Sequence, residues 1–462
     1  MLKLKDLLSV DHSESNLSGL NTDEKFSGVS IDSRKVRKNE IFFAVKGENF
    51  DAHEFLKDVF EKGIKLAVVN KKWYNKNKSK YKGKSLIAVE DTIQALGQFA
   101  SAHRSRFSIP VFCIGGSNGK TTTKDLVSAV LSKKFNVLST AGNLNNHIGL
   151  PLTLLKLKNS HDIAVLEVGC SHFKEVEYLM NIARPEFGMV TNIGKEHLEF
   201  FKDLNGVAKA EFELYDYLEK NSGIVFMNFD DKFIRNKAMK IKKAKVISYS
   251  YDFKTDVTGT FEGYNKNYQP VINVHYNSKS FTATISTFGK HSIYNGLAAV
   301  TAGLAFKVNV NSIKKALKNF KQNSSKRMEI IDHKGIKFIN DSYNSNPESV
   351  KMGLETLLGY KNKGEKYAVL SDMLELGKGS KEEHSEIGRY ARKIGIKNLF
   401  TYGKYSLNTF KSAGKIKNNF YFNDKSDLSE MLKRNLRSGD VVYVKGSRGM
   451  KMEEVINNII QN

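Results

Sequence analysis

Apolar residues in this chain gather in short runs, separated by longer segments in which apolar and polar positions mix. The short runs predict buried strands, and the mixed segments, such as 92–104, predict helices. Strands that alternate with helices are typical of an α/β fold with parallel sheets. The predicted strands lie at 41–45, 66–69, 111–114, 163–168, 187–192, 224–228, 337–340, 367–370 and 441–444.

The same pattern divides the chain into three regions. The first holds short strands around a turn-rich centre and ends in the helix predicted at 92–104. The second holds the longest succession of strands and helices, and the polar stretch 321–326 after it is typical of a linker. We therefore expect three domains, at residues 1–104, 105–320 and 321–462.

Composition agrees with an ordinary globular protein. Of the 462 residues, 40% are hydrophobic and 26% charged, which excludes a disordered, collagen-like or membrane-embedded chain. No apolar stretch approaches the length that spans a bilayer, and the charged start offers no export signal. With two cysteines, Cys113 and Cys170, we expect a cytoplasmic protein without a disulfide framework.

The charge balance is strongly basic. Lys and Arg number 73 against 49 Asp and Glu, a formal net charge of +24. Such a surface attracts polyanions, so nucleic acid is one candidate partner. The lysines, however, are spread along the whole chain, and an anionic small substrate explains the charge equally well. We expect no nucleic-acid partner.

The sharpest local signal is the segment 111–124, where an apolar strand leads into Gly-Gly-Ser-Asn-Gly-Lys-Thr-Thr. Glycines let backbone N–H groups point inward, and the N-terminus of the following helix adds a positive field, as a phosphate site requires. We expect Lys120 to reach the β- and γ-phosphates and Thr121 to bind Mg²⁺. The general pattern has glycine where this chain has Ile114, so a plain glycine turn is the alternative. The predicted ATP-binding residues are Gly116, Ser117, Asn118, Gly119, Lys120, Thr121 and Thr122.

Polar side chains follow two neighbouring predicted strands. Glu167 ends an apolar run, as a carboxylate that holds a nucleotide-bound metal would. His197 comes just after another strand, at the edge where parallel sheets bind ligands. The loop 143–151 is rich in amides, among them Asn145 and Asn146. The alternatives are a structural histidine and an ordinary Asn/Gly loop.

Taken together, these motifs resemble the Mur ligase family of ATP-dependent amide-forming enzymes. The phosphate loop, Asn-Leu-Asn-Asn at 143–146, Leu-Glu-Val-Gly at 166–169 and Thr-Asn-Ile-Gly at 191–194 occur in the family's order. The resemblance extends over essentially the whole chain. It implies a UDP-substrate-binding N-terminal domain, a central P-loop ATPase-like domain with a parallel sheet, and a C-terminal ligase domain of Rossmann-like α/β fold.

The resemblance also implies which residues contact substrates. Ser-Ile-Asp-Ser-Arg at 30–34 and the segment 42–53 resemble the family's uridine-nucleotide-binding domain, with Ala52 where the family usually has glycine. The substrate-binding residues implied are Ser30, Asp32, Ser33, Arg34, Lys46, Asn145, Asn146, Asn344 and Asn346. Further ATP contacts are implied for His291, Asn295, Arg327, Asp341 and Tyr343.

Two C-terminal motifs narrow the activity within the family. The motifs are Asp-Ser-Tyr-Asn-Ser-Asn-Pro at 341–347 and Asp-Met-Leu-Glu-Leu-Gly at 372–377, and both point to the family member that adds a dipeptide. The member that adds the third amino acid typically carries Asp-Asn-Pro-Arg, which is not found in this chain. The resemblance therefore implies an ADP-forming ligase that joins D-alanyl-D-alanine to UDP-N-acetylmuramoyl-tripeptide in peptidoglycan precursor synthesis. It implies ATP and Mg²⁺ as cofactors, no membrane insertion, and a monomer.

One departure concerns the metal. The family often carries a carbamylated lysine in Lys-Ala-Lys-x-Glu, whereas this chain reads Lys209-Ala-Glu211-Phe-Glu. A carbamate and a glutamate both offer two anionic oxygens to a hard cation. Our hypothesis is that Glu211 is an encoded substitute and joins Lys120, Glu167 and His197 as a catalytic residue. The alternatives are a surface helix carboxylate at Glu211 and a modified Lys209 in a shifted register.

Three other functions stay open. The first is another ligase of the superfamily, similar to folylpolyglutamate or cyanophycin synthetases, against which the Asp-Ser-Arg motif at 32–34 argues. The second is a nucleic-acid-dependent ATPase, suggested by the charge and the phosphate loop. The third is a nucleotide-binding protein without turnover, which the joint presence of Lys120, Thr121, Glu167 and His197 disfavours.

Overall fold

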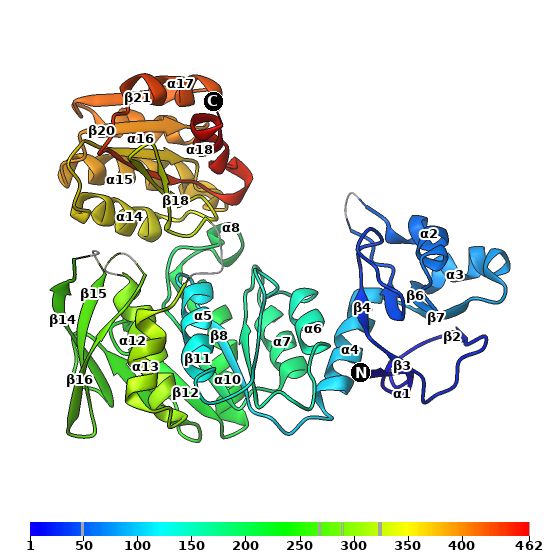
Figure 1. Ribbon diagram of the computed structural model, residues 1–462. Coiled ribbons are helices and arrows are strands. Elements are labelled where there is room, and N and C mark those ends of the chain that lie inside the picture. The colour runs from blue at the N-terminus through cyan, green and yellow to red at the C-terminus, as the bar shows by residue number, and fades with distance from the viewer. Residues whose placement is uncertain (48–49, 267–268, 288, 290, 322–325, 462) are drawn as a thin grey trace. The chain divides into compact units, whose positions relative to one another are not determined.

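The computed structural model describes residues 1–461 except 48–49, 267–268, 288, 290 and 322–325. Figure 1 labels the helices and strands along the chain. The contacts within the chain divide it into two compact units. One unit comprises residues 1–113, 135–170 and 174–187, and the other comprises 114–134, 171–173 and 188–462. The three domains expected from the sequence stay a prediction.

The N-terminal part of the first unit is a five-stranded sheet in the order β2-β7-β6-β5-β4. Apolar runs make β5, β6 and β7 nearly fully buried, so helices cover the sheet and the inner strands pair in parallel. The helix predicted at 92–104 is confirmed as α4, and Asp91 caps its first turn by accepting from two backbone N–H groups. The elements are β1 Leu2–Lys3, α1 Leu4–Leu8, β2 Glu14–Asn16, β3 Lys25–Phe26, β4 Gly28–Ser30, β5 Glu40–Phe43, η1 Ala52–Phe55, α2 Leu56–Glu61, β6 Leu66–Asn70, α3 Lys71–Asn77, η2 Lys78–Tyr81, β7 Ser85–Val89 and α4 Thr92–Arg104.

Residues 111–284 contribute a nine-stranded sheet in the order β16-β15-β14-β13-β12-β11-β8-β10-β9. The strands predicted at 111–114, 163–168, 187–192 and 224–228 are confirmed as β8, β10, β11 and β12. The strands are β8 Val111–Gly115, β9 Val137–Ser139, β10 Ile163–Glu167, β11 Phe187–Val190, β12 Ile224–Asn228, β13 Lys245–Ser250, β14 Val257–Tyr264, β15 Pro270–Tyr276 and β16 Lys279–Thr284. The helices of this region are α5 Lys120–Leu131, α6 Gly149–Leu154, α7 Glu175–Ala183, α8 Leu198–Phe201, α9 Leu204–Glu211, α10 Glu213–Lys220, α11 Lys232–Ala238, α12 His291–Ala305 and α13 Val310–Lys318.

The C-terminal part of the second unit is a six-stranded sheet in the order β17-β18-β22-β19-β20-β21. Every neighbouring pair is parallel except β17 and β18. Apolar side chains of α14, α15 and α16 pack in one core cluster with the sheet, and those of α17 and α18 pack in another. The elements are β17 Glu329–His333, β18 Ile336–Asp341, α14 Pro347–Gly359, β19 Lys366–Ser371, η3 Gly377–Gly379, α15 Ser380–Lys393, β20 Asn398–Tyr402, α16 Ser406–Ala413, β21 Asn418–Phe422, α17 Lys425–Asn435, β22 Val441–Lys445, η4 Arg448–Met450 and α18 Glu453–Ile460.

These layers confirm the α/β fold class with several parallel sheets expected from the apolar pattern. Among the described residues, no helix combines the length and the apolar character needed to cross a bilayer. Cys113 and Cys170 are both buried.

Candidate functional site

The phosphate loop connects the end of β8 to the start of α5, the strand–loop–helix context expected from the sequence. Its backbone demands glycine at two positions, because φ is +110° at Gly116 and +79° at Gly119. A Cβ atom at Gly116 would also lie 2.6 Å from the backbone N of Thr191, and one at Gly119 would lie 2.6 Å from Asn295 Oδ1. The loop is therefore a tightly packed turn at a helix N-terminus, a geometry that suits phosphate.

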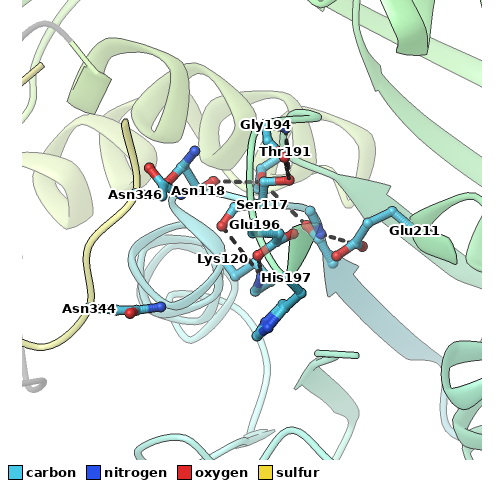
Figure 2. Close-up of polar contacts among 12 residues, drawn as sticks. Ser117, Asn118, Lys120, Thr191, Gly194, Glu196, His197, Glu211, Asn344 and Asn346 are labelled. Carbon is cyan, nitrogen blue, oxygen red and sulfur yellow. Dashed lines mark hydrogen bonds and ion pairs between the residues drawn. The ribbon is translucent and has the colours of Figure 1, made fainter. Parts of the chain in front are cut away.

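The loop is held by the segment that follows β11 (Figure 2). Ser117 Oγ accepts from the Gly194 N–H at 2.8 Å, and Asn118 N–H donates to Asn192 Oδ1 at 3.0 Å. Thr191 Oγ1 donates to the Asn118 carbonyl oxygen at 2.7 Å. These bonds fix the loop before any ligand binds, so the site is preorganised.

Lys120, the predicted phosphate ligand, is the first residue of α5 and directly follows this loop. Its Nζ is 3.1 Å from Glu196 Oε2 and 3.4 Å from the Ser117 carbonyl oxygen. The side chains of Lys120 and Glu196 are only 15% and 12% exposed. Sequence reasoning missed Glu196, although it is the residue directly before His197.

Glu211 reaches the same loop from the end of α9 (Figure 2). The residue is 2% exposed, and its Oε2 accepts from the Gly116 N–H at 2.6 Å. Burial, together with Glu196, raises the pKa of Glu211 to about 7 against the opposing charge of Lys120. A surface carboxylate at this position is excluded by its burial.

His197 is held by a carboxylate from a distant part of the sequence. Its backbone φ is +48°, and its Nδ1 forms an ion-pair contact of 2.6 Å with Glu375 Oε2. Burial lowers the pKa of His197, but the nearby carboxylates of Glu375 and Glu196 outweigh burial and raise it above its ordinary value. Glu375 belongs to the Asp-Met-Leu-Glu-Leu-Gly motif, but sequence reasoning assigned it no role.

Glu167 lies in the first unit, at the end of β10, and is 1% exposed. Its Oε1 accepts from Asn145 Nδ2 at 2.9 Å, while Oε2 has no hydrogen-bond partner among the described residues. Asn146 has a structural contact instead, because its side chain accepts from the Gly149 N–H at the start of α6. The structure thus brings Asn145 and Glu167 together, a contact that was not predicted from the sequence.

Two buried oxygen atoms, one in each compact unit, are each of a kind that binds hard cations. Within the described part of the chain, Glu167 Oε2 and Thr121 Oγ1 are buried without a hydrogen-bond partner, although buried polar atoms are nearly always paired. No group of three or more His, Cys, Asp or Glu side chains among the described residues could hold a metal alone. Each oxygen by itself is of the kind that Mg²⁺ binds, since Mg²⁺ typically takes one or two protein oxygens together with substrate phosphates.

The other predicted ATP contacts fall in two places. Asn295, in α12, is buried and accepts from Thr123 Oγ1 at 3.1 Å beside the loop. The Arg327 guanidinium carbon lies 3.9 Å from the centre of the Tyr343 ring, so these two predicted residues form a cation–π pair. His291 begins α12, but its side chain lies outside the described residues.

Asp341 is paired with a lysine that sequence reasoning missed. Lys445 is 3% exposed, and its Nζ lies 2.6 Å from Asp341 Oδ2 and 2.9 Å from the Asn344 carbonyl oxygen. The signal in the sequence that could have identified Lys445 is a lysine at the end of an apolar run, which forms the buried strand β22. Asn346 contacts the phosphate loop, because its Nδ2 donates to Asn118 Oδ1 at 2.8 Å.

The predicted uridine-nucleotide residues lie together near β4 and β5. Arg34 forms two hydrogen bonds of 2.9 Å with the Asp32 carboxylate and lowers the pKa of Asp32 to about 2. Ser30 Oγ accepts from the Asp32 N–H at 3.3 Å, and Ser33 is buried. Lys46 keeps a side chain that is 74% exposed, 3.9 Å from Asp51. This arrangement offers exposed cations to an anionic ligand.

Comparison with known proteins covers nearly the whole chain. Residues 25–104 match the family described as "Mur ligase family, catalytic domain", residues 114–303 the "Mur ligase middle domain", and residues 326–448 "Mur ligase, glutamate ligase domain". The UDP-N-acetylmuramoyl-tripeptide–D-alanyl-D-alanine ligase of Bacillus subtilis is 34% identical, with 94% of this chain and 93% of that protein covered.

Solved structures agree with the sequence matches. A crystal structure of MurF from Acinetobacter baumannii has a TM-score of 0.89 at 27% identity and covers 100% of this chain and 99% of its own. MurF ligase from Thermotoga maritima in complex with ADP has a TM-score of 0.81 at 25% identity, with 94% and 97% covered. With these matches in fold and sequence along nearly its full length, the chain belongs to the Mur ligase family.

Proposed function

We propose that this protein is an ADP-forming ligase that joins D-alanyl-D-alanine to UDP-N-acetylmuramoyl-tripeptide in peptidoglycan precursor synthesis. The observation that carries the proposal is the match along 94% of the chain to a relative with that activity. The phosphate loop supports it, because its glycine turn and Lys120 are what ATP requires. No feature specific to folylpolyglutamate or cyanophycin synthetases favours those alternatives.

The reaction needs ATP because a carboxylate is a poor acyl electrophile. Transfer of the γ-phosphoryl group to the tripeptide's terminal carboxylate gives ADP and an acyl phosphate. The amine of D-alanyl-D-alanine then attacks the acyl carbon, and the tetrahedral intermediate loses phosphate and a proton to give the amide. We assign to Lys120 and the N–H groups of 116–122 the task of neutralising the transferred phosphoryl group.

We further propose Mg²⁺ as the second cofactor, and we assign Thr121, Glu167, His197 and Glu211 as the residues that would hold it. The buried Thr121 Oγ1 and Glu167 Oε2, without hydrogen-bond partners among the described residues, support this proposal. When bound, Mg²⁺ would lower the repulsion between ATP and the substrate carboxylate as a Lewis acid. Glu211 supplies the carboxylate that relatives of the family obtain from a carbamylated lysine.

The remaining contacts divide by domain. We propose that residues 1–104 bind the uridine nucleotide through Ser30, Asp32, Ser33, Arg34 and Lys46. Residues 105–320 would hold ATP, and 321–462 would contact it from the far side. For ATP we assign His291, Asn295, Arg327, Asp341 and Tyr343, and for the peptide Asn145, Asn146, Asn344 and Asn346. Because one chain supplies every motif, we expect a monomer, and ATP dependence with two buried thiols fits the cytoplasm.

A phosphate-release assay tests the proposal. Purified protein receives ATP, Mg²⁺ and UDP-N-acetylmuramoyl-tripeptide, with and without D-alanyl-D-alanine. We expect release that requires both substrates, together with a pentapeptide product in the mass spectrum. Release with folates, or with DNA and no amine acceptor, would instead support a related ligase or a nucleic-acid-dependent ATPase. Nucleotide binding without turnover would contradict an enzymatic role.

A further inference from the structure

Two carboxylates engage the donors that a phosphate would need. Lys120 Nζ lies 3.1 Å from Glu196 Oε2, and the Gly116 N–H donates to Glu211 Oε2 at 2.6 Å (Figure 2). Glu196 and Glu211 also share a hydrogen bond. The result is one connected network in which a single lysine faces two glutamates, at 12% exposure for Glu196 and 2% for Glu211.

The position of Glu196 is fixed by the residues on either side of it. The Lys195 N–H donates to Glu348 Oε2 at 3.3 Å, and Lys195 Nζ lies 2.6 Å from Glu383 Oε1. His197 is paired with Glu375 at 2.6 Å. Because both neighbours are anchored, Glu196 is held toward Lys120 and does not swing freely with a loop.

A nucleotide phosphate competes with these carboxylates for the same partners. Phosphate oxygens bind the backbone N–H groups and the lysine of such a loop. When a phosphate takes those donors, Glu196 and Glu211 lose their bonds and face an additional anion in a buried place. An ionised carboxylate beside a phosphate is strongly unfavourable at low local dielectric unless a cation is present.

We propose that Glu196 is a positioning residue: with Glu211 it stands in for phosphate in the nucleotide-free loop, and it makes tight nucleotide binding conditional on a divalent cation. The inference rests on the proposed function, in which this loop takes ATP. While no nucleotide is bound, Glu196 pairs with Lys120, so the positive charge of the lysine is not left unpaired in the loop. The same carboxylates disfavour metal-free nucleotide, which is unproductive for phosphoryl transfer.

The test measures ADP binding by calorimetry, once in EDTA and once in excess Mg²⁺. The variant Glu196→Gln removes one negative charge and keeps the shape of the side chain. We expect Glu196→Gln to bind metal-free ADP about tenfold more tightly than the wild type, an effect of one close charge in a partly buried site. The gain in ADP affinity on adding Mg²⁺ should shrink by a similar factor.

Glu199→Gln is the matched control, since Glu199 lies three residues away and is exposed. It changes the net charge equally and should leave both affinities unchanged. Unchanged or weaker metal-free binding in Glu196→Gln would overturn the inference, and a merely structural role predicts weaker binding in both buffers. If Glu196→Gln does not fold, Glu196→Ala carries the same expectation. A wild-type protein that binds ADP in neither buffer would overturn the proposed function instead.

Discussion

At the scale of single residues, the proposed role of Lys120 in phosphoryl transfer can be tested. Lys120→Ala removes the cation that we assign to the phosphates, so we expect ADP formation to fall by at least about 100-fold. The fold should survive, because the loop is held by Ser117, Asn118 and Thr191 rather than by the lysine. The measurement is the rate of ADP formation, with circular dichroism as the check on folding.

Lys133→Ala is the control for Lys120→Ala. Lys133 follows the same helix, α5, and is exposed. Its removal changes the charge equally and should leave the rate within a factor of two. Near-normal turnover in Lys120→Ala would contradict the assignment of the phosphate loop.

Glu211 should leave a signature in the pH dependence of stability. Its pKa of about 7 in the folded protein lies above the ordinary value of 4.5, so the folded state keeps a proton that the unfolded state releases. The stabilisation of the folded state by this bound proton is complete below about pH 4.5 and is lost as the pH rises to about 7. Compared with Glu211→Gln, the wild type should lose on the order of 2 kcal/mol of unfolding free energy over this range, measured in urea.

The hypothesis that Glu211 is an encoded carboxylate also predicts a rate of ligation that does not depend on carbon dioxide. An encoded carboxylate needs no carbamylation, so adding bicarbonate to degassed enzyme should not change the rate of ligation. Lys209 is exposed and lies over the Phe173 ring, which disfavours it as a modified metal ligand. A strong increase of the ligation rate on adding bicarbonate would contradict the hypothesis that Glu211 replaces the modified lysine.

At the scale of elements, the start of α14 couples a helix cap to the phosphate loop. Asn346 and Ser349 form a capping box, and Asn346 also donates to Asn118 at 2.8 Å. Asn346→Ala and Ser349→Ala should each lower the unfolding free energy by about 1 kcal/mol. Of these two variants, only Asn346→Ala should raise the KM for ATP, because Ser349 bonds within the cap. Equal KM values would show that the contact with Asn118 does not matter for ATP.

Continuous apolar runs were enough to predict the inner parallel strands. The runs at 111–114 and 163–168 are buried along their length as β8 and β10, so the signal is strong. The antiparallel extension by β15 and β16 was not predicted, since β15 alternates buried and partly exposed positions and β16 is largely exposed. Motif spacing located the phosphate loop because a strand, a turn and a helix are contiguous in sequence.

The partners of the site residues could not be predicted in the same way. Asp341 and Lys445 are 104 residues apart, and Lys120 and Glu196 are 76 apart, so only the folded chain brings them together. No local periodicity encodes such pairs. Glu211, at the end of a helix, is buried against the loop, so the alternative of a surface carboxylate is wrong at this position.

At the scale of the whole molecule, the charge is matched to the substrates. The chain carries a net charge of +24, while ATP and the UDP-linked peptide of the proposed reaction are both strongly anionic. Their encounter with the protein should be steered electrostatically and weakened by salt, since the screening length falls from about 14 Å at 0.05 M to about 5 Å at 0.4 M. We expect kcat/KM for the UDP substrate to fall several-fold over this range of KCl, while kcat changes little. Sucrose at matched osmolality controls for water activity, and the thermal midpoint controls for unfolding. A loss confined to kcat would place the salt effect after binding, in the chemistry or in product release, and would leave the basic surface without a role in capturing substrate.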